Sequence, residues 1–144
     1  MAKLAFCQDF MVEYMGYMCM SAVLKGSGHS VEVFFDNQVN EDAFIKELKL
    51  FSPDIVGFSL FSPTVPWALK IARRVKREIG AITIFGNVGA MVNPQIIEEE
   101  GVDIVCLAEG ELLLEELADC LDKKQSYAHI KGFWVKTSQG IIKN

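Results

Sequence analysis

The sequence of 144 residues predicts an α/β fold: a three-layer sandwich whose five-stranded parallel sheet is covered by helices on both faces and carries a C-terminal edge hairpin. Short β-rich runs alternate with stretches of helical spacing, which is typical of a doubly wound parallel sheet. The runs are continuously apolar, as expected for strands buried on both faces. The length and a hydrophobic content of 51% suit a single domain with a sizeable core.

The predicted strands are, in chain order, Lys3–Cys7, Ser30–Phe35, Asp54–Ser59, Ala81–Phe85 and Asp103–Leu107. The predicted helices are Met11–Lys25, Glu41–Phe51, Val65–Ile79, Pro94–Glu100 and Gly110–Lys123. The third helix has one apolar stripe, made of Val65, Ala68, Leu69, Ala72, Val75 and Ile79. In the last helix Leu113, Leu117 and Leu121 align. The tail "GFWVKTSQGIIKN" predicts two short strands around a Ser-Gln-Gly turn.

Composition excludes several classes of function. The net charge is −5 and Lys and Arg do not cluster, so we expect no nucleic-acid partner. The four cysteines form no C-x-x-C pair, which argues against zinc or iron–sulfur ligation and favours free thiols in a reduced cytoplasm. The uncharged stretch 79–97 is interrupted by Gly, Asn and Pro, so it is not a membrane span. A soluble, cytoplasmic protein is expected.

The loops after the strands lack the common phosphate and nucleotide signatures. In a parallel sheet, ligands bind beyond the carboxyl ends of the strands. The first such loop, "CQDFMVEYMG", contains neither G-x-G-x-x-G nor a run of Ser and Thr. An acceptor Asp after the third strand and a Lys after the fifth are also absent, since Ser59 and Glu109 stand there. Dinucleotide, flavodoxin-type phosphate, receiver and P-loop sites are therefore excluded.

Small residues and hydroxyls occupy the same loops instead. Gly86, Gly89 and Ala90 follow the fourth strand, and Ala108 and Gly110 follow the fifth. Glycine at a strand end lets another group approach the backbone closely. Together with the hydroxyls of "SLFSPT" (59–64), these loops predict a slot rather than a catalytic pocket. Turn chemistry alone is the alternative interpretation.

Five segments, in this order, resemble the cobalamin-binding domain at the N-terminus of many radical S-adenosylmethionine (SAM) enzymes: "GSGHSVEVFF", "SPDIVGFSLFSPTVPWALKIARRVKRE", "IFGNVGAMVNPQIIEEEGVDIVCLAEGE", "ELADCL" and "IKGFWVKTSQGIIKN". That family typically reads G-H-x-V, P-D-V-V-G-x-S, a glycine pair near a strand end, G-x-D-x-V-x-G-E-G-E and a closing hairpin. Here Asn87 replaces the second glycine of the pair, and Ala108 replaces the first glycine of G-E-G-E.

The resemblance implies a flavodoxin-like, Rossmann-like fold in which the nucleotide tail of cobalamin enters the slot and the corrin ring lies over the sheet edge. Carried over by position, the implied cofactor-binding residues are Ser59, Leu60, Phe61, Ser62, Thr64, Gly86, Asn87, Val88, Gly89, Ala108, Glu109 and Gly110. Corrinoid carriers with D-x-H-x-x-G after the first strand ligate cobalt through that histidine. This chain has none there, so no histidine is expected on cobalt.

Two patterns near the slot have competing interpretations. The segment "MVEYMGYMCM" predicts core packing, with an adaptable surface for the corrin or a catalytic domain as the alternative. Glu109 and Glu111 are expected to be helix-start carboxylates, and an acid/base pair is the weaker alternative.

The resemblance also implies the molecular context. Residues 1–144 would form one domain of a larger radical SAM protein, in which a 4Fe–4S cluster and S-adenosylmethionine belong to the missing C-terminal domain. C-x-x-x-C-x-x-C is absent here, so the chain alone should catalyse nothing. The expected partners are cobalamin and that downstream domain, without nucleic acid or membrane; homodimerisation stays open. The alternative is a degenerate domain, closed by Asn87 and Ala108, that only mediates interaction or dimerisation.

Overall fold

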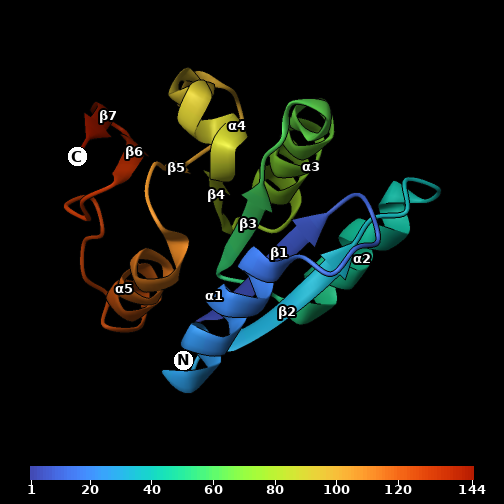
Figure 1. Cartoon of the computed structure of the whole chain (residues 1–144), viewed down its shortest axis with the longest axis horizontal. Coiled ribbons are helices and arrows are strands. Elements are labelled where there is room, and N and C mark those ends of the chain that lie inside the picture. The colour runs from blue at the N-terminus through green and yellow to red at the C-terminus, as the bar shows by residue number, and fades with distance from the viewer.

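The computed structural model describes residues 1–144 and contains one seven-stranded sheet with the order β2-β1-β3-β4-β5-β6-β7 (Figure 1). The strands are β1 (Lys3–Gln8), β2 (Ser30–Phe35), β3 (Ile55–Ser59), β4 (Ile82–Gly86), β5 (Ile104–Cys106), β6 (Phe133–Thr137) and β7 (Gly140–Lys143). Strands β1 to β5 pair in parallel, whereas β6 joins β5 antiparallel and forms a hairpin with β7. The predicted parallel sheet with an edge hairpin is confirmed.

Helices cover both faces of the sheet. They are α1 (Met15–Gly26), α2 (Glu41–Phe51), α3 (Val65–Glu78), α4 (Asn87–Val92) and α5 (Gly110–Asp122), with 3₁₀ turns η1 (Ser62–Thr64) and η2 (Pro94–Glu98). Helices α1 and α5 lie side by side on one face, and α2 and α3 lie on the other (Figure 1). None of the helices combines the length and apolar character needed to cross a lipid bilayer.

Each face of the sheet has its own apolar core because neighbouring strand residues point in opposite directions. In β1, Ala5 and Cys7 pack with α2 and α3, whereas Leu4 and Phe6 pack with α1 and α5. Both sets are buried. The flavodoxin-like three-layer arrangement thus follows from continuously apolar strands.

Some predicted boundaries are wrong. Helix α1 begins at Met15 rather than Met11, so Asp9 and Glu13 lie in a loop before it. Residues 87–92, expected as a loop because of their Gly and Asn, form the short helix α4. In α5 the buried leucines are Leu114 and Leu117, one position away from part of the predicted stripe.

The loops after β3 and β4 are joined by direct backbone contact. Leu60 N–H donates to the Gly86 carbonyl (2.9 Å), and Gly89 N–H donates to the Leu60 carbonyl (3.0 Å). A Cβ atom at residue 89 would stand 2.8 Å from the Leu60 carbonyl oxygen. Only glycine fits there, because backbone atoms cannot yield as a flexible side chain can. Helix α4 owes its position to this contact.

We therefore expect Gly89→Ala to lower the free energy of unfolding by about 1–3 kcal/mol, the usual cost of overpacking. Urea unfolding followed by circular dichroism measures it. The control is Gly26→Ala at the end of α1, where an added Cβ would meet nothing within 4 Å. Equal stability of the two variants would contradict the close approach of α4 to Leu60.

Candidate functional site

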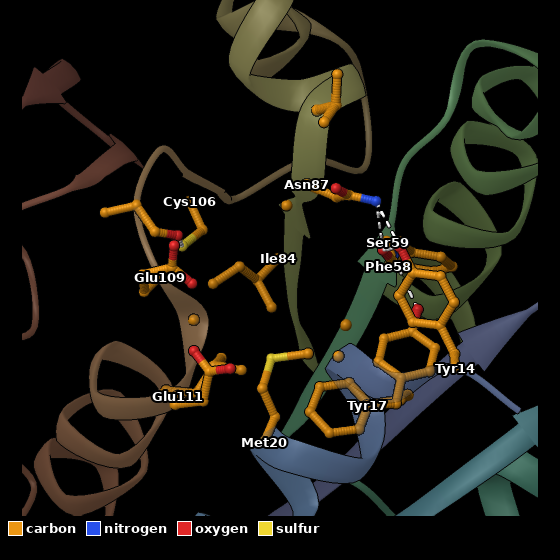
Figure 2. A pocket seen from close by; sticks show the side chains of 18 of the residues that line it. Tyr14, Tyr17, Met20, Phe58, Ser59, Ile84, Asn87, Cys106, Glu109 and Glu111 are labelled. Carbon is orange, nitrogen blue, oxygen red and sulfur yellow. Dashed lines mark hydrogen bonds between the residues drawn. The ribbon is translucent and has the colours of Figure 1, made fainter.

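A pocket of about 390 Å³ opens between α1, α5 and the carboxyl ends of β1, β3, β4 and β5 (Figure 2). It lies where the strand order reverses between β1 and β3, the position at which doubly wound sheets bind ligands. Its lining residues are Phe6, Tyr14, Gly16, Tyr17, Met20, Gly57, Phe58, Ser59, Ile84, Gly86, Asn87, Val88, Met91, Cys106, Ala108, Glu109, Gly110, Glu111 and Leu114.

Three glycines shape the walls of the pocket. The Phe6 ring occupies the space above Gly57, where an added Cβ would lie 2.8 Å from the ring. An added Cβ at Gly86 would meet only Cys106, at 3.7 Å, so this wall is bare backbone. Across the pocket, Gly110 lets Met20 of α1 approach α5. These residues give the slot its depth and its mainly apolar walls.

Tyr17 fixes α1 to the sheet at the base of the pocket. Its ring stacks on Phe6 with centroids 4.7 Å apart. Its hydroxyl donates to the Cys7 carbonyl (2.9 Å) and accepts from Ser59 N–H (2.8 Å), which bridges the ends of β1 and β3. Burial raises the pKa of the Tyr17 phenol, so this hydroxyl stays protonated as a donor.

One end of the pocket is polar, and it is built by three side chains from distant segments. The Asn87 amide nitrogen donates to the Tyr14 hydroxyl (2.6 Å) and to the Ser59 hydroxyl (3.1 Å). Ser59 Oγ in turn donates to Tyr14 (3.0 Å). Figure 2 shows this triangle beside the apolar floor. We call Tyr14, Ser59 and Asn87 the polar triad.

Asn87 also has an unusual backbone. Its φ is 72°, in the left-handed region that glycine adopts freely and that asparagine tolerates better than most residues. Its side chain bonds to Tyr14 and Ser59 at the wall of the pocket and leaves the slot open. Asparagine at this position therefore combines a glycine-like backbone conformation with an added hydrogen-bonding group.

The opposite wall carries a thiol and two carboxylates. Burial raises the pKa of the Cys106 thiol, and its Sγ donates to the Ala108 carbonyl (3.2 Å), so it remains neutral. Glu109 is the N-cap residue of α5 but makes no capping hydrogen bond, and Glu111 lies in the first turn. Both glutamates thus stand at the start of the helix, as predicted, although no side-chain capping bond forms, and both residues also line the pocket.

The structure gathers part of the residue set predicted from the sequence. Ser59, Gly86, Asn87, Val88, Ala108, Glu109 and Gly110 line the pocket. The others lie outside it: Leu60 and Gly89 join the loops, Thr64 bonds back to Phe61, and Phe61 and Ser62 are exposed. A role for these others in cofactor contact stays a prediction.

Sequence reasoning missed several lining residues. Phe6 and Gly57 lie inside strands, where the sequence predicts core residues. Tyr14 and Met20 belong to the Met-rich segment "MVEYMGYMCM". Core packing is correct for Tyr17, and Met20 is partly buried against the core, but the prediction is wrong for Met15 and Met18, which are 77% and 59% exposed. The sequence did contain one signal: Gly57, inside the run "DIVGF", indicates that another group approaches the strand backbone closely, and in the structure that group is the Phe6 ring.

Both histidines lie outside the pocket. His29 is buried at the start of β2, where Nδ1 accepts from Ala2 N–H (3.2 Å) and Nε2 lies 3.3 Å from Asp119 Oδ1. His129 is exposed beside Glu116. Neither histidine therefore lies near the loop after β1, in which the sequence has no histidine.

A flavodoxin-like sandwich with a mainly apolar slot at its topological switch point is typical of domains that bind an organic ligand at this position. The model of one family, described as "B12 binding domain", matches residues 5–118, and the chain belongs to this family.

Other proteins are similar to the chain in sequence or in fold. The chain is 27% identical over 135 residues to hopanoid C-3 methylase of Methylococcus capsulatus, covering 90% of this chain and 26% of that protein. The radical S-adenosylmethionine methyltransferase TsrM from Kitasatospora setae, solved with cobalamin and a [4Fe-4S] cluster bound, superposes with a TM-score of 0.85 at 21% identity, over 99% of this chain and 31% of TsrM. The cobalamin-dependent radical enzyme OxsB gives 0.82 at 23% identity, over 99% and 22%. The chain thus spans a third or less of each relative.

The left-handed backbone at Asn87 can be tested by comparing Asn87→Gly with Asn87→Ala. Both variants lose the amide, so the difference between them isolates the backbone. We expect the glycine variant to be more stable by about 1 kcal/mol, because alanine pays a steric cost at positive φ. Urea unfolding measures both free energies; an alanine variant as stable as the glycine variant would contradict the φ of residue 87.

Proposed function

We propose that this chain is the cobalamin-binding module of a larger cobalamin-dependent radical SAM enzyme, and that its pocket receives the nucleotide tail of the cofactor. Membership in the B12 binding domain family supports the cofactor. The single observation that carries the proposal for the tail is an open, mainly apolar slot at the switch point of the sheet, with the polar triad at one end.

The residues present suit a flat aromatic base. The volume of about 390 Å³ falls in the range of about 300–1,000 Å³ found for small-molecule sites. Phe6, Ile84 and Leu114 supply apolar surface for the ring faces. Polar atoms of a buried base need partners, which the triad provides at one end.

The corrin ring would then lie over the carboxyl edge of the sheet. Large apolar side chains are exposed there. Met15 is the first residue of α1, and Val88 and Met91 belong to α4. A planar macrocycle covering them would remove this surface from water, which favours binding. Both histidines lie elsewhere, so we propose that no protein histidine coordinates the cobalt.

Catalysis would belong to the longer protein. In the relatives, this domain occupies only part of the chain, and the names of TsrM and OxsB describe radical S-adenosylmethionine enzymes. In such an enzyme the corrin would serve as a methyl carrier or redox partner. This chain's part is to bind and orient the cofactor beside a downstream radical SAM domain; cluster and S-adenosylmethionine would be held there.

The alternative of a degenerate interaction domain required Asn87 and Ala108 to close the slot. The Asn87 amide is instead bound to Tyr14 and Ser59, and both Asn87 and Ala108 stand in the wall of an open pocket. No observation favours the alternative.

A steric block tests where the tail binds. Gly86→Leu introduces a side chain beside Cys106 without backbone strain, because residue 86 has φ −137°. The wild-type chain, mixed with hydroxocobalamin and desalted, should retain the corrin absorption bands. The variant should bind at least about tenfold more weakly, equivalent to about 1.4 kcal/mol.

The matched control for the block is Gly26→Leu, where the added Cβ would meet no neighbouring atom. It should bind cobalamin as the wild type does. Tight binding by a folded Gly86→Leu variant would show that the tail lies outside the pocket. Loss of corrin bands from the wild type itself would defeat the proposed function.

A further inference from the structure

The polar triad has one hydrogen-bond donor left over. The Asn87 amide uses its two N–H groups on Tyr14 and Ser59. The two hydroxyls share one hydrogen bond, donated by Ser59 Oγ to Tyr14. Each hydroxyl carries one proton, so one bond between them leaves one proton without a protein acceptor. With Ser59 as the donor in this pair, that proton belongs to Tyr14.

The Tyr14 oxygen, by contrast, has no acceptor capacity to spare. It accepts from both Ser59 and Asn87, at 3.0 Å and 2.6 Å, which uses both of its lone pairs. It can therefore offer a ligand only its O–H proton. Donors sealed from water by a ligand carry a free-energy penalty unless the ligand accepts from them.

The Tyr14 side chain is held in place before any ligand arrives. Its ring packs against Tyr17 (centroids 5.1 Å apart) and edge-on against Phe61 (5.8 Å). Tyr14 lines the pocket and is partly buried. A donor held in this way loses little conformational entropy when a ligand binds.

We propose that the Tyr14 hydroxyl donates to the acceptor nitrogen of the cofactor's lower base, and so selects cobamides whose base has such a nitrogen. This inference rests on the proposed function. The dimethylbenzimidazole of cobalamin has an imidazole nitrogen with a free lone pair when it is not bound to cobalt. A phenolic base, such as the cresol of p-cresolylcobamide, offers a smaller, single aromatic ring without that nitrogen.

The test compares Tyr14→Phe with the wild-type chain, titrating each with cobalamin and with p-cresolylcobamide by isothermal calorimetry. The variant keeps the ring contacts and loses only the hydroxyl. We expect its affinity for cobalamin to fall about tenfold, the effect of one lost hydrogen bond, and its affinity for the cresolyl compound to stay unchanged or rise. The cost of detaching a base from cobalt belongs to the ligand and cancels between the two proteins.

Tyr127→Phe is the matched control, since Tyr127 is also a partly buried tyrosine but does not line the pocket. It should change neither affinity, and thermal unfolding should show all three proteins folded. Equal losses for both cobamides in Tyr14→Phe, or no loss for either, would overturn the role of Tyr14 while leaving the proposed function intact. Failure of the wild type to bind either cobamide would overturn the proposed function, and this inference with it.

Discussion

The site depends on one hydroxyl group, that of Tyr17, at the place where β1 and β3 part. The two strands are paired as far as Cys7 and Phe58, while β1 continues beside β2 as far as Gln8. Beyond this point the Cys7 carbonyl and the Ser59 N–H would be buried without partners, which is costly. Tyr17 satisfies both, and because it belongs to α1 the same bonds hold that helix over the diverging strands. A gap between α1 and α5 then has a rigid floor.

The remaining walls of the pocket are positioned by contacts between the loops that follow β1, β3 and β4. Gly89 brings α4 against Leu60, directly after β3, and Asn87 at the start of α4 returns to Ser59 and Tyr14. Tyr14 precedes α1 and packs on Tyr17. The segments after β1, β3 and β4 are thus linked by backbone and side-chain bonds before any cofactor is present. Such pre-organisation lowers the entropy that binding must overcome.

The sequence predicts the fold well because its apolar periodicity is strong and local. The strand and helix order, the parallel sheet and the edge hairpin all follow from it. It predicts the site less completely, since the triad joins residues 45 and 73 positions apart in the chain. No local pattern indicates that Tyr14 reaches Asn87. Helix α4 was missed for a related reason: its Gly and Asn favour a loop, and the contact of Gly89 with Leu60 that holds it against the loop after β3 joins residues distant in the chain.

Asn87 illustrates how a departure from a family pattern can be judged physically. The glycine that usually stands there could serve two needs: a positive φ, or room for the ligand. The φ of 72° at Asn87 shows that the backbone need is met by a residue able to adopt it. The room is kept because the amide is bound by Tyr14 and Ser59 rather than left to fold into the slot. Since those bonds saturate the acceptors of Tyr14, the substitution also affects the hydrogen-bonding character of this end of the pocket, where the Tyr14 hydroxyl is left as a donor, opposite a wall that carries Glu109 and Glu111.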